Sequence, residues 1–140
     1  MRRALAFLPV PICGLLAVAA VALAAQPKDG TFKGKSSQKA DVTVTVQKKT
    51  IKSITFFGYC KGDKSHSKFG YGFAKLDGRV DANGHFSERE AADPTIGNGQ
   101  VVTFQGRFVT PKVAKGTLRL RGRPGGPCDT GKVKFTIKHK

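Results

Sequence analysis

The 140-residue chain has no tryptophan, only two tyrosines and only 9 acidic residues against 25 basic ones. Sugar-binding sites usually stack sugar rings on exposed tryptophan or tyrosine, so this composition argues against a stacking glycan site and leaves an electrostatic one open. A helical 3.6-residue periodicity is also absent after the first 25 residues. The chain is therefore not helical, and its net charge of +16 points towards anionic partners.

Motifs for catalysis are missing as well. His66, His85 and His139 lie in a loop, beside a turn and near the C-terminus, and none has a partner at the spacing of a metal site. No serine stands in the context of a nucleophile elbow. We therefore expect no enzymatic activity, no catalytic residue, no cofactor and no metal.

Asp77, Asp81 and Asn83 carry oxygen atoms that would suit calcium, but the remaining acidic positions of a calcium loop are missing. Turn chemistry alone explains the sequence from Asp81 to Gly84, because Asp, Asn and Gly favour tight turns and Asn-Gly is typical of a β-hairpin. We expect a turn between two strands here.

A long apolar run is found only at the N-terminus. Two arginines precede the apolar residues 11–23, and small residues then lead into a polar segment, which is the pattern of a secretory signal peptide cut near Ala24 or Ala25. We expect residues 1–25 to be this signal peptide, and residues 26–140 to be one domain that is secreted or held in the cell envelope. The alternative is an uncleaved anchor, but prolines and a glycine leave the unbroken run shorter than the ~20 residues of a membrane span.

Signal cleavage leaves 115 residues, a net charge of +14 and two cysteines, Cys60 and Cys128. Cys13 lies inside the signal peptide and lacks the small preceding residues of a lipidation site. Two cysteines in an exported protein most simply form one disulfide, and no close Cys-x-x-Cys pair suggests a redox role. Closing a loop of 68 residues stabilises the folded state by ~4 kcal/mol in the chain-entropy model.

The clearest strand pattern lies between Gly99 and Leu120. Val102, Phe104 and Phe108 alternate with polar residues, and the alternation resumes after the turn-forming residues 110–112. Two period-2 runs around a proline-containing turn predict a β-hairpin with one buried and one solvated face.

The same alternation recurs along the chain. Further strands are expected at 30–35, 41–46, 51–60, 69–80, 85–87 and 132–138. We interpret Glu88–Asn98 as a connector that has room for a short helix, and Arg121–Pro127 as irregular. Seven to nine short strands predict an all-β, single-domain antiparallel β-sandwich or flattened barrel with one disulfide.

The tripeptide Gly-x-Phe occurs at residues 30–32, 84–86 and 106–108. Glycine permits a turn or bulge at the strand entry, and the phenylalanine is then the first inward anchor. With a late cysteine before a final strand, this pattern resembles small exported bacterial β-sandwich proteins of unassigned activity. The resemblance implies a fold and carries over no functional residue.

The segment Lys68–Ala74 is similar to the aromatic strand of RNA-recognition and cold-shock domains, in which alternate aromatic rings stack on bases. No second aromatic motif accompanies it, and the signal peptide directs the protein away from RNA. We favour an interpretation in which Phe69, Tyr71 and Phe73 face the core.

The basic residues follow the outward parity of the late strands: Arg107, Lys115, Arg119, Arg121 and Arg123, then Lys132, Lys134, Lys138 and Lys140. If these strands share one sheet, their outer faces form a cationic field that attracts anionic cell-surface or extracellular polymers. The candidate anion-binding residues are Arg107, Arg119, Arg121, Lys132, Lys134 and Lys138. The alternative is a solvated face on a structural or protein-interaction module, which uses a sheet edge or Glu88–Asn98.

Overall fold

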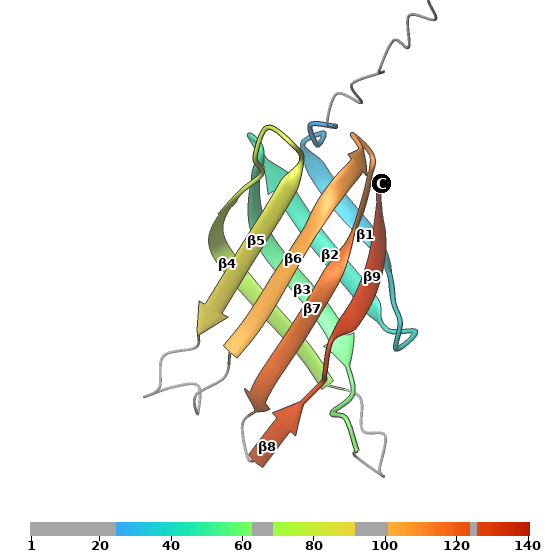
Figure 1. Ribbon diagram of the computed structural model, residues 1–140, viewed down its shortest axis with the longest axis vertical. Helices are drawn as coiled ribbons and strands as arrows, with labels where there is room; N and C mark the ends of the chain where they lie inside the picture. The colour runs from blue at the N-terminus through green and yellow to red at the C-terminus, as the bar shows by residue number, and fades with distance from the viewer. Residues whose placement is uncertain (1–24, 63–68, 92–100, 124–125) are drawn as a thin grey trace, which may run out of the picture.

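The computed structural model describes residues 25–62, 69–91, 101–123 and 126–140 (Figure 1). Within these residues the chain forms nine β-strands and no helix. The described part of the chain therefore contains no helix long and apolar enough to cross a membrane. The strands are β1 (Gly30–Ser36), β2 (Asp41–Gln47), β3 (Thr50–Gly58), β4 (Phe69–Arg79), β5 (His85–Ala91), β6 (Val101–Thr110), β7 (Val113–Arg123), β8 (Gly126–Asp129) and β9 (Val133–His139). Residues 1–24, most of the expected signal peptide, lie outside the described residues.

All strand pairs are antiparallel, in one sheet of order β4-β3-β2-β1-β9-β7-β6-β5, with β8 paired to β7. The end strands β4 and β5 follow each other in sequence and lie side by side in Figure 1, so the sheet curls into a nearly closed barrel. The predicted all-β antiparallel class is confirmed, with one barrel-like sheet in place of the two packed sheets of a sandwich. The first strand pairs with the last, which places β1 beside β9.

The inner face of the barrel is apolar because the strands alternate as their sequences predict. In β2, for example, Val42, Val44 and Val46 are buried while the two threonines between them are turned outward and partly exposed. Phe104 and Phe135, from strands that flank β7, stack across the interior with ring centroids 4.8 Å apart. Burial of this apolar interior supplies the main driving force for folding, and it leaves the outer face as the surface open to ligands.

The three Gly-x-Phe phenylalanines meet inside the barrel. Phe108 contacts Phe32 and Phe86, with centroid distances of 5.3 and 5.4 Å, and all three rings are buried. Gly84 has the expected turn conformation, with φ of +74°. Gly106 serves a different purpose, because an added Cβ there would lie 2.6 Å from the Phe86 ring. The phenylalanine of each tripeptide therefore faces the core, as predicted. The glycine has one of two purposes: it forms the turn at Gly84 and allows close packing at Gly106.

The hairpin predicted between Gly99 and Leu120 is confirmed, and the strands expected at 41–46 and 51–60 form a second one. Strands β6 and β7 are joined by a tight turn at residues 111–112, and β2 and β3 by a tight turn at residues 48–49. In both, the buried parity is the predicted apolar one.

The Asn-Gly turn is present, but the two strands beside it do not form a hairpin ladder. Asp81 Oδ1 accepts hydrogen bonds from the backbone N–H groups of Asn83 and His85, at 2.7 and 2.9 Å, so the turn chemistry is as expected. The strands take their ladder partners on the other side, since β4 pairs with β3 and β5 pairs with β6. The turn thus lies where the two ends of the curled sheet meet.

Two predicted boundaries are wrong. Glu88 and Arg89 belong to β5, where they pair with β6, so the expected connector begins later; residues 92–98 lie outside the described residues. The segment expected to be irregular from Arg121 onward instead continues β7 to Arg123 and opens β8 at Gly126. Gly122, with φ of +79°, sits in a register shift, so a bulge lets the strand continue where a break was expected.

The predicted disulfide between Cys60 and Cys128 is present, with an S–S distance of 2.01 Å. It links the segment after β3 to β8, which lie far apart in sequence. Beside it, the backbone N–H of Lys61 donates to the carbonyl of Asp129 at 2.7 Å. The disulfide therefore holds the end of β8 in place, next to the polar cluster described below.

Candidate anion-binding face

The outer face of β5, β6 and β7 is organised in rows that run across the strands. Arg89 pairs with Thr103, and Thr103 pairs with Arg119, so two arginines flank one threonine. Two residues further along β6 and β7, on the same face, Val101 pairs with Arg121. The rows at this end of the face carry a dense positive charge.

On β5, β6 and β7, a row of neutral side chains lies next to this charge. Ser87, Gln105 and Thr117 are register partners across the same three strands, and Lys134 of β9 continues the row beyond β7. Hydroxyl and amide groups of this kind offer both hydrogen-bond donors and acceptors.

A second basic row follows. Arg107 pairs with His85 on one side and with Lys115 on the other. The Nε–H of Arg107 donates to the carbonyl of Asn83 at 3.1 Å, which ties its guanidinium to the β4–β5 turn.

Two hollows lie on this face. The first, which we call the Arg89 hollow, has a volume of about 640 Å³. It is lined by Arg89, Val101, Thr103, Gln105, Thr117, Leu118, Arg119, Arg121 and Lys132. Its lining brings together three of the predicted anion-binding residues, Arg119, Arg121 and Lys132, and none of the described residues in it is acidic.

The second, the Arg107 hollow, has a volume of about 430 Å³. It is lined by His85, Phe86, Ser87, Gln105, Gly106, Arg107, Lys115, Gly116 and Thr117. Gln105 and Thr117 border both hollows, so the two join at the neutral row.

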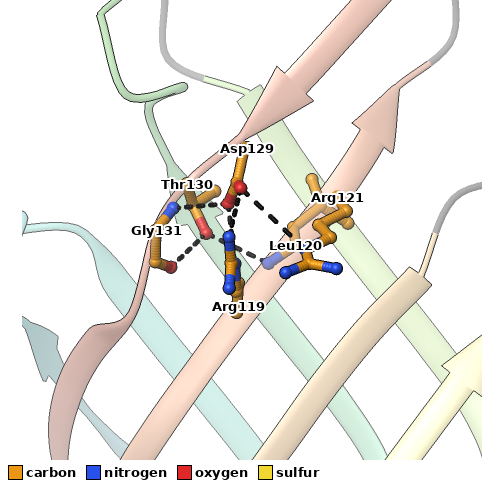
Figure 2. Close-up of polar contacts among 6 residues, drawn as sticks. All are labelled: Arg119, Leu120, Arg121, Asp129, Thr130 and Gly131. Atoms are coloured by element: carbon orange, nitrogen blue, oxygen red, sulfur yellow. Dashed lines mark hydrogen bonds and ion pairs between the residues drawn. The ribbon is translucent and has the colours of Figure 1, made fainter.

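Arg119, which lines the Arg89 hollow, forms an ion pair with Asp129 (Figure 2). Its Nε–H donates to Asp129 Oδ1 at 2.9 Å, and its Nη2 donates to Asp129 Oδ2. Arg121 Nε lies 3.9 Å from the same Oδ2 atom, and the N–H of Gly131 donates to Oδ1 at 2.8 Å. One carboxylate therefore contacts two arginines of β7.

These contacts hold the pKa of Asp129 well below its usual range, chiefly through the hydrogen bond from Arg119 and then that from Gly131. The same hydrogen bond raises the pKa of Arg119. Asp129 is consequently ionised at any physiological pH and compensates the charge of Arg119. Arg121 shares this carboxylate at 3.9 Å, whereas Arg89 and Lys132 form no ion pair with another described residue, so the positive charge of the Arg89 hollow comes mainly from these three residues.

Thr130 fixes the backbone of this cluster. The N–H of Leu120 donates to Thr130 Oγ1, and the N–H of Thr130 donates to the carbonyl of Leu120, both at 3.0 Å. Thr130 is buried, and Figure 2 shows it between Asp129 and Gly131, next to β7. Asp129 is thereby held next to Arg119.

The other predicted residues lie further out. Lys134 is exposed on β9 and pairs with Thr117, outside both linings. Lys138 pairs with Lys33 of β1, so it faces a different part of the barrel. The structure thus brings Arg119, Arg121 and Lys132 together, places Arg107 in the adjoining hollow, and leaves Lys134 and Lys138 apart. The side chain of Arg123 lies outside the described residues.

Sequence reasoning missed Arg89. The segment Glu88–Asn98 is charged and contains proline and glycine, a composition that favours a connector over a strand. The sequence signal for Arg89 is the alternation of His85, Ser87 and Arg89, which share one parity and predict that the strand extends beyond Glu88.

The remaining candidate sites are a metal site and the aromatic strand. In the described ranges, no three His, Cys, Asp or Glu side chains lie close enough to hold a metal ion. The side chains of Phe69, Tyr71 and Phe73 lie outside the described residues, although the backbone pairs Tyr71 with Phe56 and Phe73 with Ile54.

The fold and this face define a class: a basic, disulfide-linked antiparallel β-barrel with a cationic outer surface. Comparison with protein-family models finds no match to the chain, and neither does a search of curated proteins.

Proposed function

We propose that this is an exported, non-catalytic protein that binds anionic polymers or surfaces through the outer face of β5, β6 and β7. The observation that carries the proposal is the Arg89 hollow, where Arg89, Arg121 and Lys132 converge on one concave surface. A concave surface lined by charge of one sign focuses the electrostatic field and concentrates ligands of the opposite sign.

The chemistry of the lining supports anion binding over a merely solvated face. Arginine offers a planar fork of donors that matches sulfate, phosphate and carboxylate oxygens. Thr103, Gln105 and Thr117 add neutral hydrogen-bonding groups within the same concave surface. A merely solvated cationic face needs no concave arrangement of this kind.

Export is supported by two features of the chain. The Cys60–Cys128 disulfide is typical of proteins that fold in oxidising compartments. The segment after the expected cleavage site is packed on the barrel: Pro27 is buried, and the N–H of Lys28 donates to the carbonyl of Pro111 at 2.9 Å. Cleavage near Ala25 would therefore leave a domain whose N-terminal segment has a place in the fold.

The test is elution from a sulfated-dextran column by a salt gradient, using the protein from residue 26 with its disulfide formed. A variant with Arg89, Arg121 and Lys132 replaced by Gln should elute at markedly lower salt, because surface charge pairs weaken with ionic strength. The matched control replaces Lys28, Lys33 and Lys112, exposed cations outside both hollows, by Gln.

Both variants lose three positive charges, so a non-specific interaction predicts equal elution shifts. Equal shifts would contradict the proposal and favour the alternative, a structural or protein-interaction module without a defined anion site. A much larger shift for the hollow variant supports it.

A further inference from the structure

The two basic rows are separated by a fixed length of strand. The row of Thr103 and Arg119 and the row of Arg107 and Lys115 lie four residues apart along paired strands. At a rise of ~3.4 Å per residue this separation is about 14 Å. A single sulfate or carboxylate group cannot reach both rows, whereas an extended chain can.

The surface between the basic rows suits a polar, uncharged part of a ligand. Gln105 and Thr117 form the floor shared by both hollows, and Ser87 borders it from β5. Their amide and hydroxyl groups can pair with the hydroxyl groups of sugars, which are donors and acceptors alike.

The lining argues against the other large polyanions and against membranes. The two aromatic rings in the linings are Phe86, which is buried with 4% of its surface exposed, and His85, so the hollows offer bases one exposed ring and no series of stacking platforms. The large exposed apolar residues among those described are Phe57 and Val109, and neither borders a hollow. The face therefore lacks an apolar wedge that would enter a lipid surface.

From this arrangement we infer that the ligand is a linear acidic polysaccharide that lies along β6 and β7 and occupies both hollows at once. The inference rests on the proposed function and adds the class and the minimum length of the polymer. Acidic groups of the chain contact Arg89, Arg121 and Lys132 at one end and Arg107 and Lys115 at the other, while sugar hydroxyls lie over Gln105 and Thr117.

Simultaneous contact with two clusters gives an avidity that neither cluster has alone. The second cluster binds at the high effective concentration set by the chain that connects the two. Affinity should therefore rise steeply once an oligosaccharide is long enough to span both rows, and more slowly with further length.

The experiment measures the dissociation constants of size-fractionated heparin oligosaccharides, from disaccharide to decasaccharide, at one moderate salt concentration. The proteins are the wild type and a variant with Arg107→Gln and Lys115→Gln. The control variant, with Lys33→Gln and Lys112→Gln, has the same charge. Circular dichroism and thermal unfolding verify that each variant is folded.

We expect the decasaccharide to bind the wild type about tenfold or more tightly than the disaccharide. The Arg107/Lys115 variant should lose most of that gain and keep its disaccharide affinity, whereas the control variant should keep both. A decasaccharide that binds the Arg107/Lys115 variant and the control variant equally would overturn the two-hollow inference but leave anion binding standing. Failure of every oligosaccharide to bind, also when the titration is repeated at low salt, would instead remove the proposed function itself.

A competing ligand separates the polymer classes. A single-stranded oligodeoxynucleotide of the same charge as the decasaccharide should bind more weakly, and vesicles of phosphatidylglycerol should not displace the decasaccharide. Tighter binding of the oligodeoxynucleotide, or displacement by the vesicles, would contradict the assignment to a polysaccharide.

Discussion

Arg119 and Asp129 are joined by two parallel hydrogen bonds between the outer face of β7 and the end of β8. This pair places one carboxylate beside a surface that is otherwise cationic. It orients β8 and the disulfide next to it, and at the same time it compensates one of the charges that would otherwise face the Arg89 hollow. We therefore expect the Asp129 carboxylate to stabilise the fold and to weaken the binding of anionic ligands.

Replacing Asp129 by Asn should change the two properties in opposite directions. Losing the charge should lower the free energy of unfolding by about 1 kcal/mol, a modest value because both side chains are partly exposed and solvent screens the pair. Retention on sulfated dextran should increase, since Arg119 becomes available to the ligand. Asp77→Asn, at a carboxylate that is 92% exposed, makes the same charge change as a control and should have a smaller effect on both.

The stabilisation by Asp129 should depend on pH in one direction. Because folding lowers the pKa of this carboxyl, its contribution is complete above the unfolded pKa of ~3.9 and is lost as the pH falls towards the folded value. The difference in unfolding free energy between wild type and Asp129→Asn, measured in urea, should be constant between pH 6 and 8. It should shrink below about pH 4; a difference that grows on acidification would show that the carboxyl is not stabilised in its charged form.

The disulfide should account for much of the stability of the domain. Replacing Cys60 and Cys128 together by Ser should lower the free energy of unfolding by up to ~4 kcal/mol, because the unfolded chain is no longer closed into a loop of 68 residues. Urea unfolding of both proteins, with and without reductant, measures this difference. If reductant destabilised the Ser variant as much as the wild type, the effect would not come from this bond.

The space at Gly116 should not accommodate even a methyl group. An added Cβ would lie 2.6 Å from the Phe135 ring and 2.8 Å from Gly106 Cα of the paired strand, so strands or rings must shift. Gly116→Ala should destabilise by about 1–3 kcal/mol, as overpacking of a core typically does. Gly72→Ala is the control, because its nearest contact would be Thr55 Oγ1 at 3.7 Å, and thermal unfolding should hardly change. Equal effects of the two substitutions would show that the core above Gly116 is not tightly packed.

The sequence predicted most of the fold because strand alternation is a local property. Phe104 and Phe108 have the parity of the core, and the threonines beside the valines of β2 have that of the surface. Closure of the barrel is not local: the Asn83-Gly84 turn has the sequence of a hairpin turn, yet its strands form their ladders elsewhere, β4 with β3 and β5 with β6.

The candidate site was predictable only in part, for the same reason. Parity identifies Arg119, Arg121 and Lys132 as outward-facing, but it does not show which strands lie next to each other. That Arg89 joins them, and that Lys138 lies apart beside Lys33, follows from the pairing of β5 with β6 and of β9 with β1. The partner of Arg119 also depends on β8, which glycines and prolines conceal in the sequence.

Binding through the outer face of β5, β6 and β7 is tested most directly by titrating the ¹⁵N-labelled domain with a heparin decasaccharide and mapping the shifts of the backbone amides. The largest shifts are expected at Arg89, Thr103, Gln105, Thr117 and Arg121, while the amides of Thr43 and Thr45 on β2 should remain unchanged. Shifts concentrated on β2 and β3, or spread evenly over all exposed lysines, would contradict a ligand site on this face.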